Sequence, residues 1–178
     1  MSIEINDITL ILKQGDITEQ TTDAIVNAAN SHLAHGGGVA AAIAQKAGKQ
    51  LIDASNNAPE IPTGQVFTTT AGNLSAKYVI HAVGPIWRGG GYNEDQLLHQ
   101  AVINSLREAD RLKLQSISLP AISTGIYGFP ITRAAIIILE TIVEFCTSQN
   151  SSLKTIAMIL FSRDDFEIFN TRLKRLST

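Results

Sequence analysis

The chain has 178 residues, of which 44% are hydrophobic and 17% are charged, and this composition excludes an intrinsically disordered protein. Fourteen Lys and Arg residues against sixteen Asp and Glu residues give a formal charge of −2, which excludes the basic excess that drives non-specific nucleic-acid binding. A single cysteine excludes an internal disulfide and a multi-cysteine zinc site.

We expect one domain over residues 1–178, because this length is typical of a single hydrophobic core. The N-terminus lacks the pattern of a signal peptide, and no uncharged apolar run reaches roughly 18 residues. The prediction is therefore a soluble cytoplasmic protein with neither a nucleic acid nor a membrane as partner.

Apolar runs rich in β-branched residues predict six strands, at 8–12, 24–28, 65–70, 78–83, 116–122 and 155–161. Four of these runs are apolar almost throughout, which is typical of strands that are covered on both faces. We expect the N-terminal pair of strands to add an antiparallel edge, so the sheet should be mixed.

Helical patterns lie between these strands. An alanine-rich stretch covers 39–47, apolar side chains recur every three or four positions after Asn93, and residues 131–147 are apolar on nearly all sides. Asn93 and Ser162 are expected to cap helices. Helices alternating with buried strands predict an α/β protein, a three-layer α/β/α domain around a mixed, mostly parallel sheet of about six strands.

Two glycine-rich loops follow predicted strands, at Gly36–Gly38 and at Ser123–Gly128. Glycines at the start of a helix let backbone N–H groups approach an anion, which the helix dipole also favours. Ligand sites in open α/β sheets lie beyond the carboxyl ends of the strands, so two such loops suit a diphosphate better than a single phosphate. Either loop could instead serve only as a cap or turn, and neither fits the triphosphate or dinucleotide fingerprints.

Three polar residues at strand ends are further candidates for ligand binding. Asn27 and Asn30 flank two alanines, and an amide there can bond a sugar hydroxyl or, alternatively, its own turn. Asp16 follows the first long strand, where its carboxylate can accept a hydrogen bond from an exocyclic amine or simply cap a turn.

The histidines and the cysteine carry weaker signals. His32 and His35 lack a third ligand at suitable spacing, so no metal site is expected. His81 lies in an apolar run and is expected to be a core residue with satisfied hydrogen bonds, whereas His99 has no visible partner. Cys146 is predicted to be a buried, inert thiol.

Taken together, the motifs resemble the macrodomain family. The order Gly-Asp-Ile-Thr, Ile-Val-Asn-Ala-Ala-Asn, His-Gly-Gly-Gly-Val and Pro-Ala-Ile-Ser-Thr-Gly-Ile-Tyr-Gly matches that family from about residue 8 to residue 175. The resemblance implies an α/β/α module that binds ADP-ribose without a cofactor, with mono-ADP-ribosylated proteins as partners. With the two asparagines included, the ligand-binding residues that it implies are Asp16, Ile17, Asn27, Asn30, Gly36, Gly37, Gly38, Val39, Ser123, Thr124, Gly125, Ile126, Tyr127 and Phe161.

The resemblance is nearest to the viral macrodomains and to those attached to some ADP-ribosyltransferases. One hydrolase branch carries Asp directly after the glycine turn, where this chain has Ala40. The implied activity is hydrolysis of ADP-ribosyl esters on acidic side chains by substrate-assisted attack of water. The catalytic residues would be Asn30, which orients the distal ribose, Gly37, whose backbone positions the water, and His35, which positions the ribose or shapes the turn.

Three alternatives to this activity stay open. The first is an ADP-ribose reader without turnover, because Ala40 removes the most familiar catalytic carboxylate. The second is a phosphatase or deacetylase of ADP-ribose 1″-phosphate or O-acetyl-ADP-ribose. The third, a nucleotide-binding oxidoreductase, lacks the dinucleotide fingerprint.

Overall fold

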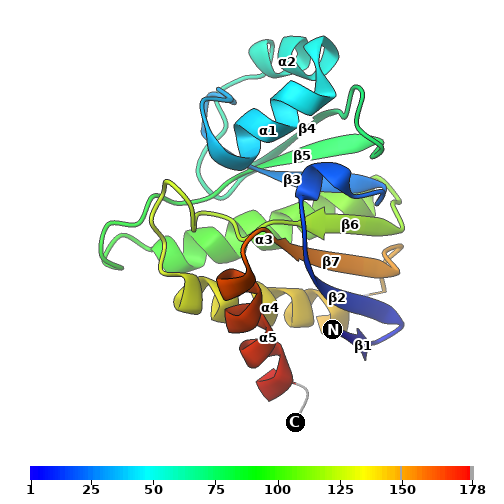
Figure 1. The fold of residues 1–178 in the computed structure, drawn as a ribbon, viewed down its shortest axis with the longest axis vertical. Coiled ribbons are helices and arrows are strands. Elements are labelled where there is room, and N and C mark those ends of the chain that lie inside the picture. Colours follow the sequence, from blue (N-terminus) through cyan, green and yellow to red (C-terminus); the bar gives the residue numbers. More distant parts are fainter. Residues whose placement is uncertain (149, 177–178) are drawn as a thin grey trace.

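The computed structural model describes residues 1–148 and 150–176, and its centre is a seven-stranded sheet in the order β1-β2-β7-β6-β3-β5-β4 (Figure 1). The strands are β1 (Ser2–Ile5), β2 (Ile8–Gln14), β3 (Ala24–Ala29), β4 (Val66–Thr70), β5 (Tyr78–Val83), β6 (Ser116–Leu119) and β7 (Thr155–Leu160). The five central strands of this order, β2, β7, β6, β3 and β5, are parallel to their neighbours. The edge strands β1 and β4 pair antiparallel with β2 and β5. The predicted mixed sheet is confirmed. The first two predicted strands, at 8–12 and 24–28, do not form its antiparallel edge as expected, because β2 and β3 pair only with other strands and the antiparallel edge at the N-terminus comes from β1.

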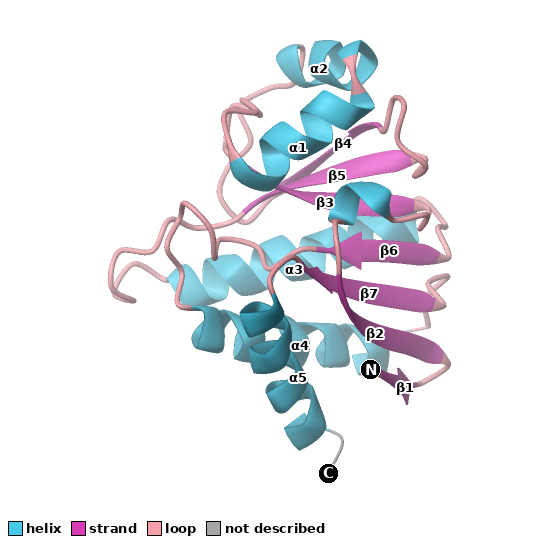
Figure 2. Cartoon of the chain, viewed as in Figure 1, coloured by secondary structure: helices cyan, strands magenta, loops and turns pink. Residues whose placement is uncertain are grey.

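Helices cover both faces of the sheet and form the predicted three layers (Figure 2). They are η1 (Ile17–Glu19), α1 (Gly38–Ala47), α2 (Lys49–Asn56), α3 (Glu94–Arg111), α4 (Ile131–Ser148) and α5 (Arg163–Leu176). Helices α1 and α2 pack on one side, and α3, α4 and α5 contribute to the larger core cluster on the other.

Alternating side chains in the central strands explain the two core clusters. Ile25 in β3 and Val79 in β5 point toward α1 and α2, whereas their neighbours Val26 and Ile80 belong to the cluster on the opposite face. All four side chains are at most 1% exposed. Because side chains of a strand alternate between faces, burial on both faces requires the continuous apolar runs seen in the sequence.

The structure departs from the predicted elements at four places. Strand β1 was not among the six predicted runs because its side chains alternate between exposed and half-buried positions. Strand β6 ends at Leu119 rather than at residue 122, since Pro120 has no N–H group to continue the ladder. Helix α2 was not predicted; it follows Gly48, whose φ of 81° ends α1.

The fourth departure concerns the helix caps. Asn93 occupies the predicted N-cap position of α3, but its φ is 59° and its side chain makes no capping hydrogen bond, so the position is confirmed and the side-chain cap is not formed. The Ser162 hydroxyl does accept a hydrogen bond from the N–H of Asp165 at 3.0 Å, which confirms the predicted cap of α5.

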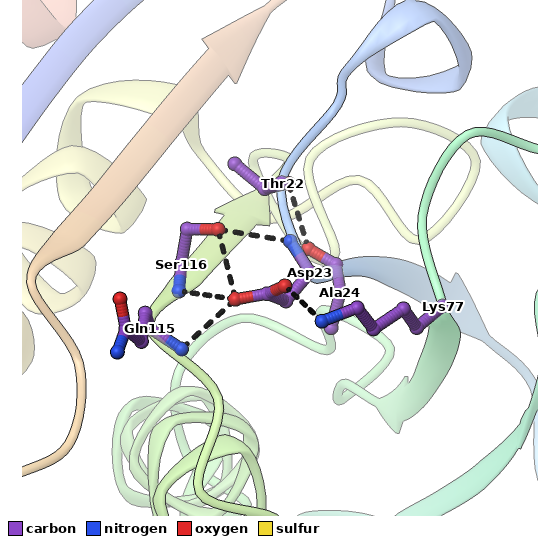
Figure 3. Close-up of polar contacts among 6 residues, drawn as sticks. All are labelled: Thr22, Asp23, Ala24, Lys77, Gln115 and Ser116. Atoms are coloured by element: carbon purple, nitrogen blue, oxygen red, sulfur yellow. Dashed lines mark hydrogen bonds and ion pairs between the residues drawn. The ribbon is translucent and has the colours of Figure 1, made fainter.

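At the amino ends of the central strands, Asp23 joins three segments that are far apart in the sequence (Figure 3). Its Oδ2 accepts hydrogen bonds from the N–H groups of Gln115 and Ser116 at 2.9 and 3.1 Å, and its Oδ1 lies 2.8 Å from the Lys77 ammonium. These donors, with the Lys77 ammonium first, outweigh partial burial and lower the pKa of Asp23. The carboxylate thus connects β3 to the starts of β5 and β6.

We predict that Asp23→Asn lowers the free energy of unfolding by about 2–3 kcal/mol, because it removes the charge from several hydrogen bonds at once. Urea unfolding measures this, with Asp53→Asn as a matched control, since Asp53 has only an exposed partner one helical turn away. A carboxylate with a lowered pKa stabilises the fold above its unfolded pKa and loses this effect as the pH falls through its folded pKa. The difference between wild type and variant should therefore vanish in acid; equal stabilities at neutral pH would contradict the prediction.

Candidate functional site

A cavity of about 670 Å³ opens beyond the carboxyl ends of β2, β7, β6, β3 and β5. Of the predicted site residues, thirteen line it: Asp16, Ile17, Asn30, Gly36, Gly37, Gly38, Val39, Ser123, Thr124, Gly125, Ile126, Tyr127 and Phe161. The order of the strands arranges these residues along the cavity. Asp16 and Phe161, which follow β2 and β7, lie toward one end, and Asn30, which follows β3, lies toward the other.

The two glycine-rich loops approach each other across the cavity. A Cβ atom on Gly37 would lie only 3.3 Å from Cδ1 of Ile126, whose side chain is otherwise 85% exposed. Gly38, the first residue of α1, has a φ of 57°, a conformation that favours glycine. Gly36, Gly37 and Gly38 line the cavity at the start of α1, where the helix dipole favours an anion.

Gly84 also lines the cavity, packs closely against Ser123, and is not among the predicted site residues. A Cβ atom on Gly84 would lie 2.1 Å from the Ser123 hydroxyl oxygen, so no other residue fits there. Ser123 is 5% exposed with a φ of 69°, and its hydroxyl has no hydrogen-bond partner in the described part of the chain. The signal for Gly84 in the sequence is its place between Val83 and Pro85, directly after the predicted strand at 78–83.

Asp16 combines the two roles that the sequence left open. Its Oδ1 accepts hydrogen bonds from the N–H and the hydroxyl of Thr18 at 2.8 and 2.6 Å, which caps η1. Its Oδ2 lies 3.6 Å from the Lys46 ammonium. Hydrogen bonds from Thr18 lower the pKa of Asp16 and outweigh the opposing effect of burial, so the carboxylate is ionised at neutral pH. Its Oδ2, beside the Lys46 ammonium, can accept a further donor.

At the rim beside Asp16, two further residues complete this end of the cavity. Phe161 follows β7, and its side chain is 80% exposed, which leaves an aromatic face open for stacking. Asp165, in the first turn of α5, also lines the cavity and was not predicted as a site residue. Its position one turn into a helix that follows a strand end was the available signal.

Asn30 shapes the loop in which it lies. Its side-chain amide donates to the carbonyl oxygen of Ala34 at 2.7 Å, and its Oδ1 accepts from the N–H of the same residue at 2.9 Å. This pair of hydrogen bonds fixes the loop between Asn30 and Ala34, just before the glycine turn. The amide is thus both a cavity-lining group and a support for the turn.

Asn27 does not line the cavity, and its assignment to ligand binding is corrected. Its side chain is fully buried, and its amide lies 3.0 Å from Nδ1 of His81. The other ring nitrogen of His81 lies 2.8 Å from the Thr69 hydroxyl. The predicted core role of His81 is confirmed, and burial lowers its pKa to about 3, so the ring is neutral.

His35 does not line the cavity either, which corrects its assignment to positioning of the ribose and leaves the shaping of the turn as its role. Its Nε2 lies 2.9 Å from the hydroxyl of Ser55 in α2. That hydroxyl donates to the carbonyl of Leu51, so it accepts from the imidazole N–H. Burial lowers the pKa of His35 and keeps the ring neutral. The side chain therefore holds the start of the glycine turn against α2 instead of reaching a ligand.

The remaining histidines, His32 and His99, and Cys146 do not line the cavity. His32 lies in a loop, 4.0 Å from Glu60, and no group of three or more metal-ligating side chains occurs in residues 1–148 and 150–176. His99 does have a partner, because its Nδ1 lies 2.9 Å from the Thr141 hydroxyl. Cys146 is buried as predicted, and burial raises the pKa of its thiol to about 11. Within the described residues, no helix has both the length and the apolarity to cross a membrane.

Comparison with known proteins agrees with this architecture. The family model described as Macro domain matches residues 26–138. The chain is 46% identical, over 90% of its length and 92% of the relative's, to the O-acetyl-ADP-ribose deacetylase of Escherichia fergusonii. Among solved structures, the Oceanobacillus iheyensis macrodomain with ADP matches with a TM-score of 0.93 and 43% identity, covering 99% of this chain and 95% of the other. The Trypanosoma brucei macrodomain in complex with ADP-ribose matches with a TM-score of 0.86 and 31% identity, covering 92% and 68%.

Proposed function

The chain belongs to the macrodomain family, and from this membership we propose that it binds ADP-ribose and hydrolyses the ester that joins ADP-ribose to acidic side chains of proteins. The observation that carries the proposal is the cavity beyond the strand ends, which is lined by two glycine-rich loops, with the Asp16 carboxylate and the exposed Phe161 ring toward one end. The solved structures of relatives with ADP and with ADP-ribose support it.

The strand order suggests how the ligand would lie. The adenine would stack on Phe161 and donate from its amine to Oδ2 of Asp16, since base–aromatic stacking is worth roughly 1–3 kcal/mol. The diphosphate would lie between the turn at Gly36–Gly38 and the loop at Ser123–Tyr127, both of which line the cavity. The distal ribose would then reach Asn30, at the β3 end of the cavity.

The residues that line the cavity favour a mechanism without a protein base at the distal ribose. They include no histidine, and their carboxylates, Asp16 and Asp165, lie at the adenine end. The position after the glycine turn is Ala40, which is buried and lines the cavity. Water would attack the anomeric carbon while the bond to the ester oxygen breaks, releasing a carboxylate, and a diphosphate oxygen would take the proton. Orientation of the distal ribose by Asn30 and stabilisation of the developing charge by backbone N–H groups would accelerate the reaction.

Hydrolysis of a small ester, O-acetyl-ADP-ribose, is the second candidate. The name of the Escherichia fergusonii relative specifically favours it. The same cavity would serve, because the ADP-ribose part of the substrate is unchanged and only the leaving acid differs.

The experiment that tests the proposal is release of ADP-ribose from a protein mono-ADP-ribosylated on glutamate, with O-acetyl-ADP-ribose assayed in parallel. Release from the protein supports the proposal, and turnover of the small ester alone supports the second candidate. Retention of the modified protein without turnover of either substrate would make the chain a reader of ADP-ribose.

We predict that Asp16→Ala weakens ADP-ribose binding about 10- to 100-fold, because it removes a charged acceptor worth roughly 1.5–3 kcal/mol. Titration calorimetry with free ADP-ribose measures the change. Asp53→Ala is the matched control, since Asp53 is paired on the surface of α2 and does not line the cavity. An unchanged affinity in Asp16→Ala would rule out the adenine contact.

A further inference from the structure

The segment from Pro85 to Asn93, here called the β5–α3 loop, projects beside the loop between β6 and α4 (Figure 1). It begins directly after Gly84, which lines the cavity at the β5 end. Two apolar side chains on it are exposed, Ile86 at 50% and Tyr92 at 64%. The loop therefore forms an outer surface next to the end of the cavity that is farthest from Asp16.

A buried carboxylate holds this exposed loop in one shape. Glu94 is 1% exposed, and it accepts hydrogen bonds from the N–H groups of Arg88, Gly90 and Tyr92 at 3.0, 3.0 and 2.6 Å. Burial raises the pKa of Glu94, but the backbone N–H groups outweigh it and lower the pKa to about 2. The carboxylate is thus ionised at physiological pH, and its charge is satisfied by the loop backbone.

The loop is also attached to the loop that lines the cavity. The N–H of Trp87 donates to the carbonyl oxygen of Tyr127 at 2.8 Å. The Trp87 ring packs on Phe129 with 4.8 Å between ring centroids, and the Arg133 guanidinium lies 5.5 Å from the centroid of the Trp87 ring. The position of the outer surface is therefore coupled to the cavity wall at Tyr127.

With the backbone fixed in this way, three side chains remain directed to the surface. Ile86 and Tyr92 supply apolar area, and the Arg88 guanidinium lies 5.9 Å from the centroid of the Tyr92 ring. Arg88 forms no ion pair with the residues that the structure describes. A cation without a carboxylate partner, held over an aromatic ring in a loop that also exposes an isoleucine, is suited to bind an acidic peptide segment.

We propose that the β5–α3 loop is the docking surface for the polypeptide that carries the ADP-ribosylated side chain, with Arg88 facing acidic residues next to the modified one. This inference rests on the proposed function. If the distal ribose lies at Asn30, the modified side chain leaves the cavity at its β3–β5 end, and the polypeptide must pass the surface that follows Gly84. The exposed isoleucine favours a polypeptide over nucleic acid, and a single free cation is too little for a phosphate backbone.

The test uses the double variant Arg88→Glu with Tyr92→Ser and keeps Glu94 intact so that the loop backbone is unchanged. For a protein ADP-ribosylated on glutamate, we expect KM to rise about ten-fold or more with kcat unchanged, the effect of losing interface contacts worth more than 1 kcal/mol. Free ADP-ribose should bind the double variant as it binds the wild type. Arg107→Glu, a charge reversal on the exposed surface of α3, is the matched control and should change neither quantity.

A charge swap sharpens the test. The Arg88→Glu variant should prefer a modified peptide with basic flanking residues over one with acidic flanks, whereas the wild type should show the opposite order, more weakly at high salt. Equal KM values for wild type and double variant, or a parallel loss of free ADP-ribose binding, would overturn the docking surface. A wild type that neither binds nor releases ADP-ribose would instead overturn the proposed function, and the docking surface with it.

Discussion

Replacing Gly125 with glutamate is expected to abolish ADP-ribose binding. Gly125 lines the cavity in the loop that faces the glycine turn, where the diphosphate is proposed to lie. A carboxylate there would occupy the space of the diphosphate and repel its charge. At about 4 Å and an effective dielectric constant of 20, each pair of like charges costs about 4 kcal/mol, close to a thousand-fold in affinity.

Loss of binding in this variant can be assigned to the site because the fold should tolerate it. A Cβ atom on Gly125 meets no atom within 4 Å, and its φ lies outside the left-handed region. Gly91, in the exposed loop before α3, shares both properties and does not line the cavity. Gly91→Glu is therefore the matched control and should bind free ADP-ribose like the wild type in calorimetry. If Gly125→Glu is folded by circular dichroism and still binds normally, the diphosphate does not lie between these loops.

Replacing Asn30 with alanine is expected to lower the rate of ADP-ribose release about 100-fold, with a smaller loss of affinity for free ADP-ribose, because misplacement of reacting groups by about 1 Å costs roughly this factor. The structure adds a reason beyond direct contact with the ribose. The Asn30 amide also holds the backbone of Ala34 on both its N–H and its carbonyl side, so its removal loosens the entry to the glycine turn.

Two companion variants separate these roles of Asn30. Asn30→Asp keeps an oxygen that accepts from the Ala34 N–H but loses the donor, so it should retain the shape of the loop better than alanine does. Asn57→Ala, at the end of α2 and outside the cavity, removes an amide that bonds only within its own helix and should leave turnover unchanged. Full activity in Asn30→Ala would show that neither contact of this side chain serves the reaction.

Some features of this protein can be predicted from the sequence because their cause is local. The central strands are buried on both faces, so they appear as apolar runs, and the predicted starts at residues 24, 78, 116 and 155 coincide with β3, β5, β6 and β7. The glycine-rich loops are recognisable because φ > 0 and close approach of backbone favour glycine wherever they occur. Strand β1 could not be predicted in this way, because an edge strand with alternating exposure has no apolar run.

The distinction between Asn27 and Asn30 could not be predicted in the same way. The two residues are alike in type and lie three positions apart, yet one amide is in the core and the other on the cavity wall. The parallel register of β3 and β5 places Asn27 directly opposite His81, and a contact across 54 residues leaves no local pattern. Likewise, the contact of His35 with Ser55 depends on α2, which was itself not predicted.

The class of the sheet, the starts of its central strands and the glycine turns beyond them could therefore be predicted from the sequence, because backbone conformation and two-sided burial constrain the residues locally. The tertiary structure alone decided which polar side chains face the cavity. Strand pairing and helix packing bring together residues distant in the sequence, and the buried ones must hydrogen-bond one another before any remain for a ligand. Asn27 and His35 are turned to partners within the protein, His81 and Ser55, although Oδ1 of Asn27 and Nδ1 of His35 have no hydrogen-bond partner among the described residues, whereas Ser123 and Asp16 line the cavity.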